Sequence, residues 1–311
     1  MTPFRGKLKT RHLEIVLMVA ELGNLSKAAT QLQSTQSGLS RAIAEIEELA
    51  GGRLFERSAK GMACTPLGDA MCRHARVMLS TMRKAEAELG AVSRGDSGSI
   101  VVGCLSMFAG WPLGDGVKKF RETYPDISLT VETGTHEKLF EDLDNGAIDV
   151  LISRFTSAVN PEIYRSVALS NDPLAMVCSK EHPLAALSEV SLEACSAYPW
   201  ITALPGSPVR AALEAKLHAA NHPTPAMIGA MSMEFGHEML HGGHYLWILP
   251  GIVAGVLHKR GTVHVLPLKL NMKRGPLAAI WRRDKSSTRQ VRAFSAMMAQ
   301  VVKEEKDAPL S

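Results

Sequence analysis

The segment with the sharpest chemical meaning is His237-Glu238-Met239-Leu240-His241, an HExxH pattern. On a helix the two histidines lie one turn apart and can bind zinc, while the glutamate polarises a water molecule. A third histidine follows closely, but Gly242-Gly243 ends a helix almost at once. No downstream histidine has the spacing of a third zincin ligand. We therefore favour an ordinary helix or adventitious metal binding, keep a metal-dependent hydrolase acting through His237, Glu238 and His241 as an alternative, and predict no enzyme activity, catalytic residue, metal or cofactor.

The cysteines offer a second chemistry, thiol oxidation. Five cysteines stand at 64, 72, 104, 178 and 195, without a CxxC pair. A redox sensor needs a thiolate of low pKa near a resolving partner, and no cation stands directly beside Cys195. We therefore predict reduced, buried thiols in a cytoplasm, with redox sensing through Cys178 and Cys195, or Cys104, as the alternative.

A third group of side chains could read DNA. Leu39, Ile43 and Ile46 recur at i, i+4 and i+7 and predict a helix with an apolar inner stripe. The opposite face is small and hydrogen-bonding, carries one cation, and fits a DNA major groove. Its residues are Ser37, Ser40, Arg41 and Ala44.

The elements before this helix would position it. Ala28, Ala29 and Leu32 predict a short helix, and residues 33–35 interrupt it with cap-forming side chains. An earlier helix is predicted to begin at Thr10 as its cap, to end at Gly23 and to bury residues 13, 16, 17 and 20. Together they predict a helix-turn-helix, with an ordinary solvated helix pair as the alternative.

A small wing is predicted after the helix pair. Residues 53–57 and 62–64 form two short strands around residues 58–61, which places Arg57 and Lys60 near phosphates or a minor groove. Thr65 and Pro66 then begin a long helix as its cap and first residue. Apolar residues recur along it every three or four positions, as in a two-helix seam that pairs two copies of the chain. The seam residues are Met71, Ala75, Met78, Met82, Ala85, Leu89 and Val92. A helix lying on its own domain's core is the alternative.

Charge is unevenly distributed along the 311 residues, whose formal net charge is +4. Residues 1–94 hold 14 Lys and Arg against 9 Asp and Glu, whereas the remainder holds 21 against 22. The basic excess therefore belongs to the segment predicted to bind DNA. No apolar run is long enough to span a membrane, and the N-terminus lacks the apolar region of a secretion signal. We expect a cytoplasmic protein with no membrane partner.

Residues 95–98 predict a hinge, and strands and helices alternate after it. Strands at 99–103, 127–133 and 148–152, with helices at 112–124 and 135–145, predict a parallel sheet covered on both faces. A second set follows from 174 to 266 and contains a helix at 209–220. The strand at 277–282 and the helix at 288–303 are expected to return to the first set, giving two lobes joined by two crossing segments.

Open parallel sheets bind ligands beyond the carboxyl ends of their strands, so a cleft between the lobes is the predicted ligand site. The lining would supply hydroxyl groups, adaptable methionines and the N-terminus of the helix that Thr135 caps, which suits a small, anionic metabolite. The predicted lining residues are Leu105, Ser106, Met107, Thr133, Thr135, Ser153, Ala203, Pro205, Met231 and Ser232. Capping or core packing is the alternative role for each of them.

Several blocks in one order and spacing resemble the LysR-type transcriptional regulators. In the first part these blocks are residues 26–29, 36–41, 53–57 and 65–68, and Ser37 stands where the family usually has proline. Looser blocks follow, at Phe120 with 124–125, 146–149, 182–184 and 242–243 leading to 249–250. The resemblance implies a winged helix-turn-helix over 1–65, a linker helix over 66–94 and an effector domain over 95–311, similar to the periplasmic binding protein fold. Its lobes would cover about 99–166 with 268–311, and about 167–267.

The function expected from these features is DNA-binding transcription regulation controlled by a small-molecule effector. Gln36, Ser37, Ser40 and Arg41 would contact base edges and nearby phosphates, with Thr35, Arg57 and Lys60 mainly on phosphate. A ligand reorienting the two lobes would change the DNA bend. The resemblance further implies dimers that assemble into tetramers, and RNA polymerase as a partner. The alternative is a ligand-binding protein whose DNA-binding domain is not functional.

Overall fold

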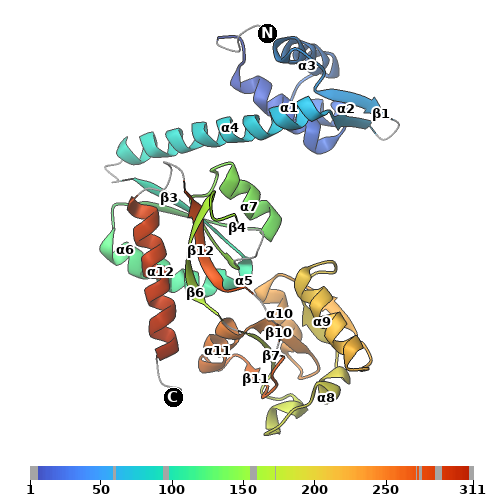
Figure 1. Ribbon diagram of the computed structural model, residues 1–311, viewed down its shortest axis with the longest axis vertical. Coiled ribbons are helices and arrows are strands. Elements are labelled where there is room, and N and C mark those ends of the chain that lie inside the picture. Colours follow the sequence, from blue (N-terminus) through green and yellow to red (C-terminus); the bar gives the residue numbers. More distant parts are fainter. Residues whose placement is uncertain are drawn as a thin grey trace. The chain divides into compact units, whose positions relative to one another are not determined.

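A computed structural model describes residues 6–58, 61–93, 98–154, 160–171, 173–270, 272, 275–283 and 289–307. Its chain divides into two compact units, and Figure 1 shows the elements of each. The first unit comprises Met1–Gly98 with Asp144–Ala147, and the second comprises Ser99–Leu143 with Ile148–Ser311. The predicted hinge residues 95–97 lie outside the described ranges.

Three helices begin the first unit: α1 (Thr10–Leu22), α2 (Leu25–Gln31) and α3 (Gln36–Ala50). Asn24 caps α2, because its side-chain oxygen accepts the backbone N–H groups of Ser26 and Lys27 at 3.0 Å. Gly23 ends α1 in the left-handed conformation, with φ 55°, as predicted. The predicted cap Thr10 is wrong, since Lys9 occupies the N-cap position and Thr10 is already helical.

The core of this unit lies among the three helices. Leu39, Ile43 and Ile46 are buried, as their spacing predicts. On α1, Leu13 and Val16 are buried as predicted, and Leu17 and Ala20 are half-buried and pack against the same core. Ile15 and Val19 are buried as well, so the inward face of α1 is wider than the four predicted residues.

The wing and the long helix follow as predicted. Strands β1 (Phe55–Ser58) and β2 (Gly61–Cys64) pair antiparallel, and α4 runs over Pro66–Ser93. Thr65 caps α4, since its hydroxyl accepts the Gly68 N–H at 3.0 Å and donates to the Arg53 carbonyl at 2.7 Å. A Cβ at Gly68 would lie 2.0 Å from the Leu54 carbonyl oxygen, so only glycine allows α4 to approach the chain before β1 this closely.

The first sheet of the second unit has the strand order β4-β3-β5-β12-β6. Strands β3, β4 and β5 are parallel, but β12 pairs antiparallel with both β5 and β6. The three strands predicted to be parallel are therefore parallel, and the last strand returns to this sheet as expected; the sequence did not predict that it runs antiparallel. The bounds are β3 (Ser99–Cys104), β4 (Ser128–Thr133), β5 (Val150–Arg154), β6 (Tyr164–Ser170) and β12 (Leu277–Arg282).

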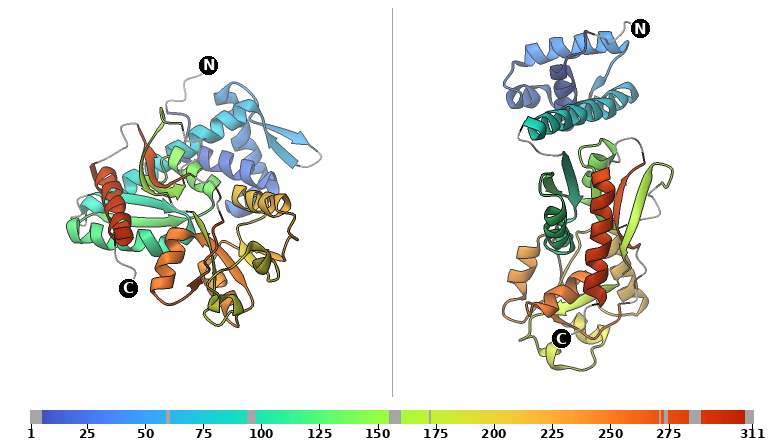
Figure 2. Two further views of the ribbon diagram at one scale, coloured as in Figure 1. Left: turned by 60° about the horizontal axis from the view of Figure 1, so that its bottom comes forward. Right: turned by 90° about the vertical axis from the view of Figure 1, so that its left-hand side faces the viewer.

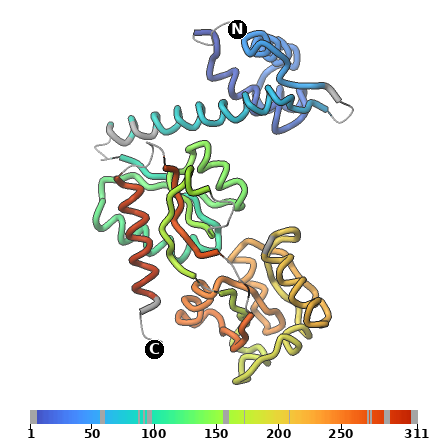
Figure 3. Tube along the Cα trace, in the orientation of Figure 1, coloured from blue at the N-terminus to red at the C-terminus, as the bar shows by residue number. Residues whose placement is uncertain are grey.

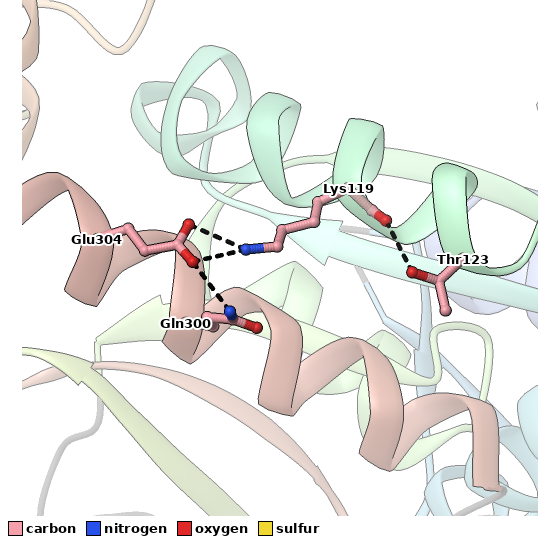
Figure 4. A network of polar contacts seen from close by, with 4 residues as sticks. All are labelled: Lys119, Thr123, Gln300 and Glu304. Carbon is pink, nitrogen blue, oxygen red and sulfur yellow. Dashed lines mark hydrogen bonds and ion pairs between the residues drawn. The ribbon is translucent and has the colours of Figure 1, made fainter.

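Helices cover both faces of the first sheet (Figure 2). Val150 and Ile152 point toward the core shared with α6 (Gly114–Thr123) and α12 (Arg289–Asp307), while Leu151 packs in the cluster of α7 (His136–Asp144). This alternation is the two-residue period of a strand buried on both faces. On the surface, Lys119 of α6 bonds both carboxylate oxygens of Glu304 on α12 at 2.7 and 2.9 Å (Figure 4).

The second sheet has the order β11-β7-β10-β8-β9, with β7 antiparallel to β10 and β11. Its inner face toward α9 buries Trp200, and its other face buries Trp247. The strands are β7 (Leu174–Cys178), β8 (Trp200–Thr202), β9 (Met227–Gly229), β10 (Leu246–Pro250) and β11 (His264–Val265). The helices are α8 (Leu192–Ser196), α9 (Pro208–Ala219), α10 (Met233–Leu240) and α11 (Gly251–Lys259), with short helical turns α5 (Ser106–Phe108), η1 (Ala109–Leu113) and η2 (Pro183–Ala186).

The two sheets of the second unit share one apolar cluster, and Figure 3 traces the chain through both sheets. Trp111 and Met298 of the first-sheet layer belong to the same cluster as Trp247 and Val253 of the second-sheet layer. Two ion pairs lie at the end of α11, Lys259 with Glu305 at 2.8 Å and Arg260 with Asp115 at 3.8 Å. The sheets are therefore parts of one packed body.

Within the described ranges, none of the helices has the length and apolar character needed to span a membrane.

Candidate functional sites

The outer face of α3 is polar and open to solvent. Gln36, Ser37, Ser40 and Arg41 are exposed, whereas Leu39 on the inner side is buried. The Arg41 Nε group lies 3.5 Å from the Ser37 carbonyl oxygen, one turn earlier on the same helix. The guanidinium therefore lies along the helix surface. This recognition face, defined by residues 36, 37, 40 and 41, can therefore offer hydrogen bonds and one positive charge to a groove.

Thr35 acts as the N-cap of α3. Its hydroxyl accepts the Gly38 N–H at 3.0 Å and lies 3.3 Å from the Ser37 hydroxyl. This bond fixes the first turn, which proline would otherwise preset at position 37. The side chain of Arg57 and the whole of Lys60 lie outside what the structure describes.

A groove of about 600 Å³ runs between α3 and the wing. It was not predicted from the sequence. Ser40 and Ala44 line it from α3, and Arg53 and Met62 line it from the wing side. Glu47 holds the two parts together, because its Oε1 accepts the backbone N–H groups of Leu54 at 2.8 Å and Phe55 at 3.3 Å. Glu47 stands among other glutamates of the same helix, Glu45 and Glu48, so the sequence gives no signal for this role.

The apolar seam on α4 divides into two parts. Met71 is 8% exposed and belongs to the first unit's own core, and Ala75 is 0% exposed. Met78, Met82 and Leu89 are 39%, 42% and 68% exposed, and Ala85 is exposed as well. The side chain of Val92 lies outside the description. We call Met78, Met82, Ala85 and Leu89 the exposed seam.

A cavity of about 570 Å³ lies between the two sheets of the second unit, a size suited to a small metabolite. Six of the ten predicted residues line it. They are Leu105, Met107, Thr135, Ala203, Pro205 and Met231. Thr135 also caps α7 as expected, since its hydroxyl accepts the Lys138 N–H at 3.3 Å.

The four other predicted residues are not among the residues that line the cavity. Ser106 is half-buried in α5, and Thr133 is exposed at the end of β4. Ser232 caps α10, accepting the Phe235 N–H at 3.1 Å and donating to a Glu234 carboxylate oxygen at 2.8 Å. Ser153 is fully buried, and its hydroxyl lies 3.1 Å from the His136 Nδ1.

Four polar residues of the lining were not predicted as ligand contacts: His136, Glu137, Arg154 and Ser207. Arg154 is buried and donates from Nη1 to the Gly275 carbonyl at 3.1 Å. Burial lowers the pKa of His136, although the nearby Glu137 carboxylate opposes the shift. The strand end Ser153-Arg154 was recognisable in the sequence, but adjacent residues of a strand point to opposite faces, and it is the arginine that reaches the cavity.

The HExxH residues do not form a zinc site. Helix α10 ends at Leu240, and His241 has φ −59° and ψ 137°, so the two histidines do not share a helical turn. His237 packs edge-on against Trp247, with ring centroids 5.5 Å apart, and burial lowers its pKa. Among the residues that the structure describes, no three His, Cys, Asp or Glu side chains are grouped to hold a metal ion.

The five cysteines are free thiols, of which Cys64 is half-buried and the other four are buried. Burial raises the pKa of Cys72 and Cys195 to about 12 and that of Cys178 to about 11. Burial also raises the pKa values of Cys64 and Cys104. None of the five therefore has the low pKa of a redox sensor.

Comparison with known proteins identifies the two domains. Residues 10–69 match the model of the bacterial regulatory helix-turn-helix protein, lysR family, and residues 93–303 match the LysR substrate binding domain. The HTH-type transcriptional regulator GbpR of Azospirillum brasilense is 28% identical over 296 residues, covering 92% of this chain and 86% of that protein.

Solved structures show the same fold. CbnR, a LysR family transcriptional regulator, has a TM-score of 0.66 at 20% identity and covers 95% of this chain and 99% of its own. Full-length CbnR complexed with its target DNA gives 0.64 at 21% identity, covering 96% and 99%. Full-length BenM gives 0.53 at 18% identity, covering 98% and 100%. This chain belongs to the LysR family of transcriptional regulators, DNA-binding proteins with a helix-turn-helix domain and a substrate-binding domain rather than enzymes.

Proposed function

We propose that the recognition face of α3 reads the operator sequence through a DNA major groove. The observation that carries this proposal is the division of α3, with its apolar stripe buried and Gln36, Ser37, Ser40 and Arg41 exposed on the other side. A guanidinium at this position suits a guanine edge, and the hydroxyl groups suit either base edges or phosphates. Thr35, Arg57 and Lys60 would contact mainly phosphate, because they flank the helix start and the wing.

The test is a gel shift with the full chain and the DNA upstream of its own gene, over a range of salt concentrations. Arg41→Ala is expected to weaken specific binding by roughly 1–3 kcal/mol, since it removes a base contact. Arg165→Ala, which removes an exposed arginine from β6 of the second unit, is the matched control and is expected to bind as the parent does. Equal affinity of the Arg41→Ala protein and its parent would remove Arg41 from the reading face.

The exposed seam supports self-association through α4. Three apolar side chains exposed by 39% or more on one helix face form a stripe that a second copy can cover. A dimer built in this way would present two recognition helices to a partly palindromic site. Dimers assembling into tetramers, and contact with RNA polymerase, extend this proposal by family likeness.

The cavity of the second unit is proposed as the effector site. Its volume suits a small metabolite, and most of its lining is apolar, with Arg154 and His136 as polar groups suited to an anionic end. Binding there would change how the paired DNA-binding parts are presented, and so change the DNA bend rather than the recognition face. The proposed division is 1–65 for DNA reading, 66–94 for pairing and 95–311 for the effector, with lobes at about 99–166 with 268–311 and about 167–267.

A further inference from the structure

The His136 ring is held in one orientation at the wall of the cavity. Its Nδ1 lies 3.1 Å from the Ser153 hydroxyl oxygen. Its ring is tilted against Phe140 with centroids 4.7 Å apart, and Phe140 in turn packs edge-on against Tyr164 at 6.1 Å. These contacts leave Nε2, the nitrogen on the far side of the ring, without a hydrogen-bond partner among the described residues. His136 therefore lines a ligand-sized space and keeps one ring nitrogen without a described hydrogen-bond partner.

A serine is well suited to hold this ring, because a hydroxyl can both donate and accept. When the ring is neutral, the Ser153 hydroxyl can donate to Nδ1, and the ring proton then resides on Nε2. When the ring is protonated, Nδ1–H can donate to the same oxygen. Ser153 is fully buried, so water does not replace it. The ring can thus gain a proton without losing its anchor.

The surroundings of His136 favour the neutral form of its imidazole ring when no ligand is bound. Burial lowers the pKa of the imidazole, with Glu137 acting in the opposite direction. Among the described lining residues, Glu137 and Arg154 are the charged groups, and those contributed by the second-sheet layer are uncharged. At neutral pH the ring is therefore a neutral donor beside a mostly apolar space.

We propose that His136 is the residue that selects the polar end of the effector, donating from Nε2–H to an anionic group, and that binding takes up a proton. Ser153 is the positioning residue for this contact. The inference rests on the proposed role of the cavity as the effector site. An anion beside the ring favours the imidazolium form, so the bound state holds a proton that the free state lacks. By linkage, affinity for the anion must rise as the pH falls.

The experiment measures binding to the full-length protein by calorimetry at about pH 6 and about pH 8, on either side of the ordinary histidine pKa. The probes are benzoate and hexanoate, which join an apolar body to a carboxylate, with benzamide and galactose as neutral comparisons. The two acids remain ionised across this range. They are expected to bind about three- to tenfold more tightly at the lower pH.

Three variants separate the roles. His136→Gln keeps an N–H donor near the position of Nε2 but cannot titrate, so acid binding should persist at the higher pH with a flat pH profile. His136→Phe removes the donor and should weaken acid binding by about tenfold or more. Ser153→Ala removes the anchor of the ring and should flatten the pH profile, which a loss of packing alone would not do. Circular dichroism spectra that match the parent establish that each variant is folded.

Four results would overturn the inference: acid binding that does not depend on pH, unchanged binding by the folded His136→Phe protein, tighter binding of the neutral probes, or no binding of any probe. The DNA-reading proposal is judged separately, by gel shifts without ligand. A protein that binds acids as described but shifts no DNA would contradict the proposed regulator and leave the His136 inference standing.

Discussion

The recognition face and the cavity of the second unit differ in how the fold presents them. The recognition face is one side of a single helix, with polar side chains in water and an apolar stripe directly beneath. The cavity is assembled from strand ends and helix starts of two sheets, and its wall is mostly apolar with a few polar groups. A regular element fixes the first surface, whereas the second depends on several separate segments. The recognition face should therefore be lost when the core beneath it is destabilised. The cavity should tolerate changes in the residues of its wall.

A pair of truncations tests this difference with the largest expected effect. Ile46 is fully buried under the recognition face, so Ile46→Ala should destabilise the first unit by about 2–5 kcal/mol through lost contacts and a new void. Met231 already faces the cavity, so Met231→Ala should cost about 1 kcal/mol or less. Scanning calorimetry measures both changes. Similar losses at the two positions would contradict the comparison.

The exposed seam offers the next prediction, since it is a helix face without a core of its own. Met82→Glu combined with Leu89→Glu should give monomers in analytical ultracentrifugation, because charge replaces the apolar stripe. Affinity for a two-half-site operator should then fall by about tenfold or more, as the two contacts become independent. Arg83→Glu, which adds the same charge beside the seam, is the control. A double variant that stays dimeric would place pairing elsewhere.

The smallest effect is expected at the surface network of α6 and α12. The hydrogen bond from Lys119 holds the pKa of the Glu304 carboxyl below its usual range. A lowered carboxyl pKa contributes stability above the unfolded value, and this contribution is lost as the pH falls through the folded value. Lys119→Met should therefore lower the melting temperature slightly near neutrality, with the difference disappearing in acid or in high salt. A difference that persists in acid would show that packing, not charge, is responsible.

The sequence predicted the recognition face well because the relevant pattern lies within one continuous segment. The spacing of Leu39, Ile43 and Ile46 is enough to predict which side of the helix is buried. The antiparallel pairing of β12 could not be found in this way, since β12 pairs with β5 and β6 from a distant part of the chain. Strand β6 was missed because its polar residues face solvent at the edge of the sheet and interrupt any apolar run.

The cavity could be predicted from the sequence in part, less fully than the recognition face but better than the pairing of β12. Strand ends such as Ser153-Arg154 could be located from the sequence, because parallel strands bring their carboxyl ends together. Which residue of the two enters the cavity depends on the phase of the pleat, which a buried apolar strand does not reveal. The pairing of Ser153 with His136 depends on the docking of α7 against β5, a tertiary contact that no local pattern encodes.

The apolar cluster shared by the two sheets limits how an occupant of the cavity can act. Parting the sheets widely would bring Trp111 and Trp247 into water and break the Lys259–Glu305 pair. Exposed aromatic surface costs about 25 cal/mol per Å², so wide opening is disfavoured. A bound molecule is instead expected to make the two packed sheet layers slide past each other, on the order of 1–2 Å. With the proposed role of the cavity as the effector site, we therefore expect the two lobes to shift by shear and to unfold together as one cooperative block.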